Sequence, residues 1–348
     1  MNTTFYHLNL INPLINASGV KCMYSSQLDE LASSNIGSIV TKTCTPSPRQ
    51  GNPEPRYYEP KNHLLTINSM GLPNEGVQYY LDYYKKKSAS LQLSGKGRFL
   101  SLGGLSINEN LNMLDIIYQN PENLTYLDAI EVNLSCPNIV GKAQLGYDFQ
   151  NLESYLRVIF TKIKKLEEML LVDMTKNVEL EKPELKDKDD TKYKVLIGCK
   201  LPPYFDMSHF QLVADILNKF PRLDYINCIN SIGNGLVIDS DTETVVIKPK
   251  NGFGGLGGKL VKPTALANVH QFYRLLGDKV KIIGCGGVSN GDDLFQMILA
   301  GATLVAVGSQ IMIKGVKCID TILRELEDIM EKKSYSTLDE FRGKLQYM

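Results

Sequence analysis

Eight short apolar runs, rich in β-branched residues, recur along the whole chain and constrain its fold more than any other feature. Each run is too short for a helix and is typical of a strand that is buried on both faces. Longer segments with apolar residues at helical spacing, such as Gln150 to Leu171, separate the runs. The runs are Leu14–Ala17, Ser38–Thr41, Phe99–Leu102, Ala129–Leu134, Val195–Cys199, Asp224–Ile229, Val280–Gly284 and Leu304–Val307.

Strands that alternate with helices in this way over about 300 residues predict a (β/α)8 barrel, which is an α/β fold. A doubly wound open sheet has the same alternation and is the competing interpretation. We favour the barrel because eight strands in one unit fit a closed sheet. We therefore expect residues 1–348 to form one (β/α)8 (TIM) barrel domain with loop insertions.

The composition disfavours several classes of protein. The 348 residues include 38 basic and 38 acidic side chains, and this balance argues against nucleic acid as the main partner. The seven cysteines are scattered without a C-x-x-C pair and the four histidines stand far apart, so we expect no disulfide framework and no metal site. Met1 to Leu10 contains no apolar signal segment, and no apolar run has the length of a membrane helix, which predicts a cytoplasmic chain without membrane contact.

Three segments interrupt the alternation of strands and helices. Gln50 to Asn74 is a long loop with specific turn residues, which favours a functional role. A hairpin strand is predicted at Thr244–Lys248, after the sixth run. Residues 172–192 predict a charged surface insertion, because Lys176 to Lys192 holds 5 lysines and 6 acidic residues.

Gly252 to Gly257 matches the pattern G-x-G-x-x-G, which is often a dinucleotide-binding signature. That signature should open a helix directly after a buried strand and carry an acidic residue about 20 positions later. Residues 272–277 contain no acid, and Lys259 to Pro263 interrupts the start of a helix. We interpret the segment as a flexible loop whose backbone approaches a ligand.

The residues that follow the predicted strands are polar side chains and glycines. In a (β/α)8 barrel these carboxyl ends meet on one face and form the active site. Lys42 and Lys200 are costly there unless they face a negative group, although a lysine at the rim can also extend to solvent. With both lysines at one mouth, we predict an anionic ligand. The strand ends carry Ser18-Gly19, Lys42-Thr43, Gly103-Gly104, Asn133 to Asn138, Lys200, Asn230-Ser231, Gly286-Gly287 and Gly308-Ser309.

Small residues follow both of the last two predicted strands, at Gly286-Gly287 and Gly308-Ser309. The loops after these two strands are the usual phosphate site of the barrel, because backbone N–H groups at helix starts bind anions. Tight turns that require glycine are the alternative explanation. Two such turns side by side favour phosphate binding.

Cys136 lies just past the fourth predicted strand and precedes Pro137, which favours an exposed loop. Cys199, Cys228 and Cys285 lie in or at the end of apolar runs and are interpreted as buried packing residues. A thiolate at position 136 could act as a base or a nucleophile. No histidine lies near a strand end, so we favour a base that works without a histidine partner.

Five motifs together resemble the dihydroorotate dehydrogenases over nearly the whole chain. They are Asn133-Leu-Ser-Cys-Pro-Asn138, Ile67-Asn-Ser-Met-Gly-Leu-Pro73, Lys200-Leu-Pro-Pro-Tyr-Phe205, Asn230-Ser-Ile-Gly-Asn-Gly235 and Ile247 to Gly258. The chain looks most like the class 1A enzymes, which are soluble homodimers that use fumarate. The resemblance implies an FMN-binding barrel that oxidises (S)-dihydroorotate to orotate and reduces fumarate to succinate in de novo pyrimidine (UMP) biosynthesis.

The resemblance also implies a role for each matching residue. Cys136 would remove the C5 proton of dihydroorotate while hydride passes from C6 to flavin N5, and Lys42 would lie between flavin and substrate. The implied substrate-binding residues are Lys42, Asn68, Met70, Gly71, Leu72, Asn133, Asn138, Asn230 and Ser231. The implied FMN-binding residues are Ala17, Ser18, Gly19, Lys42, Thr43, Asn133, Lys200, Ile229, Gly257, Gly258, Gly286, Gly287, Gly308 and Ser309.

Two features bear on the enzyme class. Membrane-linked relatives carry an N-terminal helical extension and a serine base, whereas here the first strand begins by about Leu14 and the base position holds Cys136. Class 1B relatives use a cysteine but need a partner subunit with FAD and an iron–sulfur cluster, and the proline-containing loop Gly51 to Tyr57 looks like class 1A. A class 1B-like NAD-linked subunit, another flavin barrel enzyme that acts on a pyrimidine, and a non-catalytic flavin- or phosphate-binding barrel remain alternatives.

Overall fold

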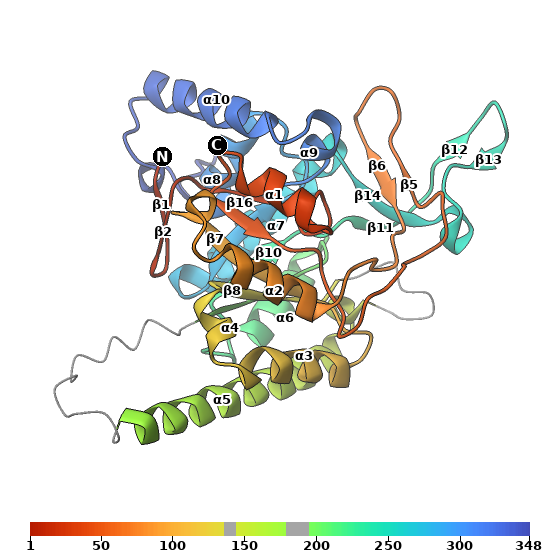
Figure 1. The fold of residues 1–348 in the computed structure, drawn as a ribbon. Helices are drawn as coiled ribbons and strands as arrows, with labels where there is room; N and C mark the ends of the chain where they lie inside the picture. Colours follow the sequence, from red (N-terminus) through yellow and green to blue (C-terminus); the bar gives the residue numbers. More distant parts are fainter. Residues whose placement is uncertain (136–143, 179–194) are drawn as a thin grey trace.

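Eight parallel strands close into a barrel at the centre of the computed structural model, which describes residues 1–135, 144–178 and 195–348 (Figure 1). Each strand pairs with the next along the chain, and the last pairs with the first. The barrel is therefore confirmed over the open sheet. Each predicted run overlaps one of its strands, although β7, β9 and β15 extend beyond their runs. They are β3 (Leu14–Asn16), β4 (Ser38–Val40), β7 (Gly97–Leu102), β8 (Ala129–Asn133), β9 (Leu196–Lys200), β10 (Tyr225–Cys228), β15 (Lys281–Cys285) and β16 (Leu304–Val307).

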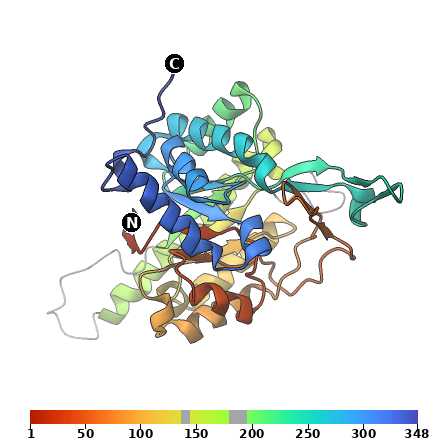
Figure 2. The same ribbon diagram turned by 90° about the horizontal axis from the view of Figure 1, so that it is seen from above.

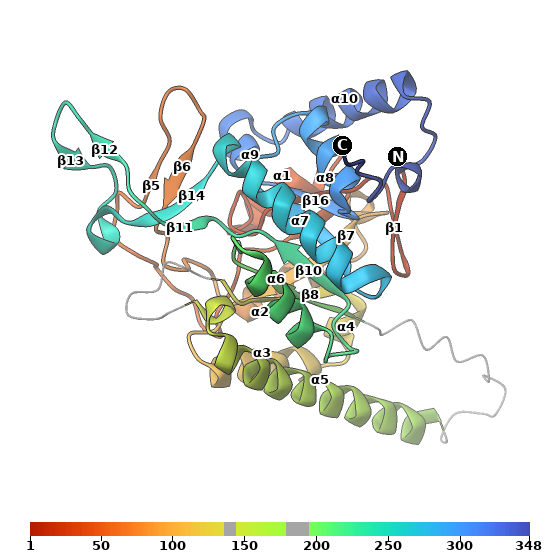
Figure 3. The ribbon, with the colours of Figure 1, turned by 180° about the vertical axis from the view of Figure 1, so that it is seen from behind.

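Helices surround the barrel on its outside (Figures 1 and 3). They turn apolar faces toward the strands, as the helical spacing predicts. The α-helices are α1 (Ser25–Ala32), α2 (Val77–Lys87), α3 (Ile107–Gln119), α4 (Glu122–Thr125), α5 (Phe149–Val178), α6 (Met207–Leu217), α7 (Lys262–Leu276), α8 (Gly291–Ala300), α9 (Ser309–Lys314) and α10 (Cys318–Lys332). Short 3₁₀ helices lie at η1 (Leu91–Leu93), η2 (Leu145–Tyr147), η3 (Pro249–Gly252), η4 (Lys259–Val261), η5 (Gly277–Lys279) and η6 (Leu338–Glu340).

A hairpin of β1 (Thr3–Phe5) and β2 (Leu8–Leu10) covers the amino end of the barrel. The Tyr6 hydroxyl donates to the carbonyl oxygens of Asp224, directly before β10, and of Lys279, two residues before β15. Phe5 inserts between Phe99 and Tyr225, with ring centroids 6.0 Å and 5.6 Å away. We call these three buried rings the apolar plug.

The side chains inside the barrel change from apolar to polar along the strands. On β7, the inward-facing residue after Phe99 is Ser101, two positions further along the strand. On β10, the inward-facing residue after Tyr225 is Asn227. On β8 the sequence Ala129, Glu131, Asn133 makes the same change. Alternate residues of a strand point to the same face, so the polar members gather near the carboxyl end. All of them except Asn133 are buried.

A four-stranded antiparallel sheet and a hairpin project from the barrel, and we call them the arm (Figures 1 and 2). The sheet has the order β11 (Ile232–Gly235), β14 (Gly254–Gly257), β6 (Thr66–Asn68), β5 (Tyr57–Tyr58), and the hairpin consists of β12 (Ile238–Asp239) and β13 (Thr244–Val245). The interpretation of Gly252 to Gly257 as a flexible loop is wrong, because four of its residues form the paired strand β14. Position 255 must nevertheless be glycine, because a Cβ there would lie 2.1 Å from the Ser231 hydroxyl oxygen.

Two elements differ in length from the prediction. The hairpin strand predicted at Thr244–Lys248 ends at Val245. The backbone N–H of Lys248 instead donates to the Pro55 carbonyl oxygen. Helix α5 continues beyond Leu171 to Val178, so the first part of the predicted insertion at 172–192 is helical. Residues 179–194 lie outside the described residues.

Candidate active site

A cavity of about 340 Å³ opens at the carboxyl ends of the barrel strands and is bordered by the arm. All the sequence-predicted site residues in the described part of the chain line this one cavity. They are Ala17, Ser18, Gly19, Lys42, Thr43, Asn68, Met70, Gly71, Leu72, Asn133, Lys200, Ile229, Asn230, Ser231, Gly257, Gly258, Gly286, Gly287, Gly308 and Ser309. Cys136 and Asn138 lie outside the described residues.

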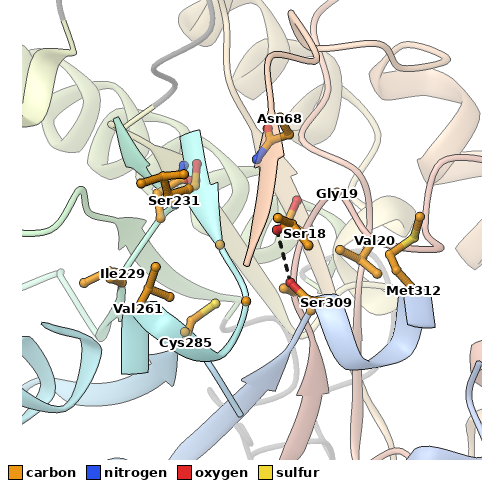
Figure 4. A pocket seen from close by; sticks show the side chains of 18 of the residues that line it. Ser18, Gly19, Val20, Asn68, Ile229, Ser231, Val261, Cys285, Ser309 and Met312 are labelled. Carbon is orange, nitrogen blue, oxygen red and sulfur yellow. Dashed lines mark hydrogen bonds between the residues drawn. The ribbon is translucent and has the colours of Figure 1, made fainter. Parts of the chain in front are cut away.

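The wall of the cavity is assembled from distant parts of the sequence, as Figure 4 shows. Asn68 comes from β6 of the arm, and Ser231 from the segment between β10 and β11. Ser18 and Gly19 follow β3, and Ser309 begins α9 after β16. Closure of the barrel brings the first and last of these strands together.

Both predicted lysines are buried at the cavity. Lys42 is 8% exposed and Lys200 is 6% exposed. A Cβ at Gly19 would lie 3.0 Å from the Lys42 Nζ atom, so the ammonium group fits closely against backbone that lacks a side chain. Lys200 Nζ donates to the Oδ1 atom of Asn227 at 2.8 Å. Each lysine is therefore held within the protein and does not extend along the rim to solvent.

Three asparagines that line the cavity are oriented by hydrogen bonds. Asn68 Nδ2 donates to the Gly255 carbonyl at 3.1 Å, which connects β6 to β14. Asn133 Oδ1 accepts from the Ser135 backbone N–H at 3.0 Å. Asn230 Nδ2 donates to the carbonyl and the hydroxyl of Ser135, both at 2.9 Å. A side-chain amide has two donors and an acceptor oxygen with two lone pairs, so such a set suits a planar ligand with both donors and acceptors.

Another part of the cavity wall is formed by backbone at Gly286 and Gly287. Their φ angles are +134° and +78°, in the region that favours glycine. A Cβ at Gly287 would lie 2.6 Å from the Lys262 Cβ atom. Neither glycine N–H donates a hydrogen bond within the described part of the chain. Two N–H groups here, next to the start of α9, provide the donors that an anion requires.

Sequence reasoning missed several residues that line the cavity. Glu131 lies inside the apolar run Ala129–Leu134, and its charge in a buried strand was the signal that could have identified it. Thr66, Val261 and Met312 line the cavity without an unusual sequence context. Cys285 was interpreted as a packing residue and is buried, but it also lines the cavity (Figure 4).

The described cysteines are poor candidates for a base. All six are buried, and each is a free thiol. Burial raises the pKa of Cys22 to about 11 and that of Cys228 to about 12, while the positive charges of Lys42 and Lys200 respectively oppose this rise. The Cys22 and Cys228 thiols therefore stay protonated near neutral pH.

The comparison with known proteins assigns the family. A family model described as Dihydroorotate dehydrogenase matches residues 1–330. The chain belongs to the dihydroorotate dehydrogenase family. It is 46% identical over 345 residues to the dihydroorotate dehydrogenase (fumarate) of Saccharomyces cerevisiae, covering 99% of this chain and 98% of that protein. It is 44% identical over 346 residues to dihydroorotate dehydrogenase A (fumarate) of Lactococcus lactis subsp. lactis, covering 99% of each.

Solved structures agree with the family's fold. Ligand-free DHODH from Eimeria tenella superposes with a TM-score of 0.76 at 20% identity, covering 99% of this chain and 91% of that one. At this identity the likeness supports the barrel architecture alone. No helix within the described residues has the length and apolar character needed to cross a membrane. The same residues contain no group of three or more His, Cys, Asp or Glu side chains suited to a metal ion.

Proposed function

We propose that this protein is an FMN-dependent enzyme that oxidises (S)-dihydroorotate to orotate in pyrimidine (UMP) biosynthesis, with fumarate as the electron acceptor. The single observation that carries the proposal is the convergence in one cavity of every described site residue implied by the family motifs. The full-length similarity to enzymes named dihydroorotate dehydrogenase (fumarate) supports the same reaction and acceptor.

The residues at the cavity fit FMN. Gly286, Gly287, Gly308 and Ser309 would hold the phosphate with backbone N–H groups, because the helix start and glycine backbone favour an anion there. Ala17, Ser18, Gly19, Thr43, Ile229, Gly257 and Gly258 would enclose the rest of the cofactor. Gly257 must lack a side chain in this wall, since a Cβ there would lie 2.8 Å from the Thr66 hydroxyl oxygen. Bound FMN would supply the redox chemistry by accepting a hydride from dihydroorotate and then delivering electrons to fumarate.

The remaining residues would orient the substrate. Asn68, Asn133, Asn138 and Asn230, with Ser231, would bind the pyrimidine ring and carboxylate through their amides and hydroxyl. The backbone of Met70, Gly71 and Leu72 would contribute further donors to the carboxylate. Lys42 would lie between cofactor and substrate, where its buried ammonium attracts the anionic substrate. Fumarate, a small dicarboxylate, would use the same subsite after orotate leaves.

Cys136 would act as the base that takes the C5 proton, and a substitution tests this role. Cys136→Ala should nearly abolish dihydroorotate oxidation, because every cysteine within the described residues is buried and could not replace it as the base. FMN should remain bound, as its absorbance spectrum would show. Cys136→Ser should retain slow activity that improves at high pH, since a hydroxyl is a weaker acid than a thiol. Wild-type turnover in the alanine variant would remove the assignment.

The acceptor is tested with one purified sample assayed in parallel against fumarate, NAD and a quinone. Turnover with fumarate alone is expected. Turnover with NAD only in the presence of a second subunit would point instead to a class 1B-like enzyme.

We also propose a cytoplasmic homodimer. Four exposed apolar side chains on the arm and its connecting loops support association there, and two of them, Ile238 and Val245, are paired across the hairpin. The four side chains are Leu236, Ile238, Val245 and Phe253.

A further inference from the structure

Glu131 is a carboxyl group buried at the floor of the cavity. It lies in β8, is 1% exposed and is the one Asp or Glu that lines the cavity in the described part of the chain. A carboxylate removed from water in this way is costly unless other groups compensate its charge. The substrate and phosphate subsites of the proposed function do not use it, so its place at the floor requires another explanation.

A hydrogen-bonded chain joins Glu131 to Lys200. Asn227 Nδ2 donates to Glu131 Oε2 at 2.8 Å, and Asn227 Oδ1 accepts from Lys200 Nζ at 2.8 Å. Rotating the amide by half a turn would place its NH₂ against the ammonium group and its oxygen against the carboxylate. The two charges therefore fix the amide in one orientation, and the amide fixes the position of the lysine.

A second chain leads from Glu131 across the floor to Ser18. The Ser101 hydroxyl lies 3.5 Å from Glu131 Oε1 and 3.0 Å from the Thr43 hydroxyl. The Thr43 hydroxyl lies 3.0 Å from that of Ser18, which in turn is 2.8 Å from the Thr41 carbonyl. Each hydroxyl has a single proton, so an ionised Glu131 draws these protons toward itself. A protonated Glu131 donates into the chain and turns them toward Thr41.

Opposing effects act on the pKa of Glu131, and the largest of them, burial, leaves it raised. Burial raises its pKa above the usual value, whereas the positive charge of Lys200 and the hydrogen bonds from Asn227 and Ser101 lower it. Lys200 and Ser18 both line the cavity proposed for FMN. A change at Glu131 is therefore transmitted to two points of the cavity wall.

We propose that Glu131 is a positioning residue, which acts through Asn227 to hold the Lys200 ammonium at the cofactor and offsets its charge, and so sets how readily the bound flavin accepts electrons. The inference rests on the proposed function, because it assumes FMN in this cavity. In the proposed function Glu131 has no part in binding substrate or in the proton transfer. Its effect would be electrostatic, since a negative charge at this cavity would oppose the negative charge that develops when FMN bound there is reduced.

The test compares the midpoint potential of FMN bound to wild type, Glu131→Gln and Tyr225→Phe. Glutamine keeps the size of Glu131 and removes its charge, so the potential should shift to a more positive value. Tyr225 faces the same barrel interior, and its hydroxyl has no hydrogen-bond partner within the described residues. Its replacement by phenylalanine should leave the potential at the wild-type value. Equal potentials in wild type and Glu131→Gln, with FMN bound to both, would overturn the inference.

A measurement on the wild-type holoenzyme covers the case in which Glu131→Gln does not fold. Infrared difference spectra between reduced and oxidised enzyme should contain a carboxyl band that moves when glutamate is labelled with ¹³C. Absence of any glutamate response to flavin reduction would overturn the inference. Purified wild-type protein that binds no FMN would instead overturn the proposed function, so the two failures are distinguishable.

Discussion

The two ends of the barrel are built from the same eight strands but hold opposite kinds of side chain. At the amino end, Phe5, Phe99 and Tyr225 pack into the apolar plug with no ligand-sized space between them. At the carboxyl end, Lys200, Asn227 and Glu131 form hydrogen bonds around a cavity. Stability is thus concentrated at one end and binding at the other, so substitutions at the two ends should affect different measurements.

The largest effect is expected for Phe5→Ala in the plug. Phe5 is fully buried, and removing a buried aromatic ring costs about 3–5 kcal/mol of the free energy of unfolding. Denaturant unfolding monitored by circular dichroism measures this loss. Leu91→Ala, at a side chain that is 90% exposed, serves as the control and should change stability little. If both variants unfold at the wild-type denaturant concentration, the plug does not carry the stability assigned to it.

A smaller effect, mainly on FMN binding, is expected for Gly287→Ala at the cavity. The added Cβ would lie 2.6 Å from Lys262 at a φ of +78°, which distorts backbone proposed to hold the FMN phosphate. We expect FMN to bind about tenfold more weakly or worse, from a strain of roughly 1–3 kcal/mol. Titration of the apoprotein with FMN gives the dissociation constant.

Gly315→Ala is the matched control for that substitution. Gly315 has a similar φ of +69°, yet nothing lies within 4 Å of the added Cβ. It should destabilise the protein slightly and leave FMN affinity unchanged. The same loss of affinity in both variants would mean that backbone strain, and not the shape of the cavity, explains the result.

The smallest effect is a pH dependence from Glu131. Its folded-state pKa is raised above the usual 4.5, so the folded state binds more protons than the unfolded state once the pH exceeds that value. The stability that this group contributes is fully present below pH 4.5 and is lost as the pH rises through the folded-state pKa. The melting temperature of wild type relative to Glu131→Gln should therefore increase as pH is lowered toward 4.5. A difference that is independent of pH would contradict the raised pKa.

The comparison of the two ends also shows what the sequence could predict. Lys42, Lys200 and the paired glycines were identifiable because strand ends in a barrel share one face. Glu131 was missed because it lies within a strand, and its partner Asn227 lies 96 residues further along the chain. Strand β14 was missed because four glycine-rich residues lack β propensity, and only pairing with β6 and β11 makes them a strand.

Pairing of β16 with β3 has a consequence for the order in which the molecule assembles. One edge of the first barrel strand, β3, stays unpaired until residues 304–307 have folded against it. The hydrogen bond from Tyr6 to the Asp224 carbonyl joins residues that are 218 positions apart in the sequence. Contacts between such distant residues form slowly, because the intervening chain loses much entropy when its ends are joined. Most of the polypeptide must therefore be synthesised before Phe5 can pack against Tyr225 and complete the apolar plug. Until then the exposed strand edge and the ring of Phe5 are surfaces that chaperones could protect from aggregation.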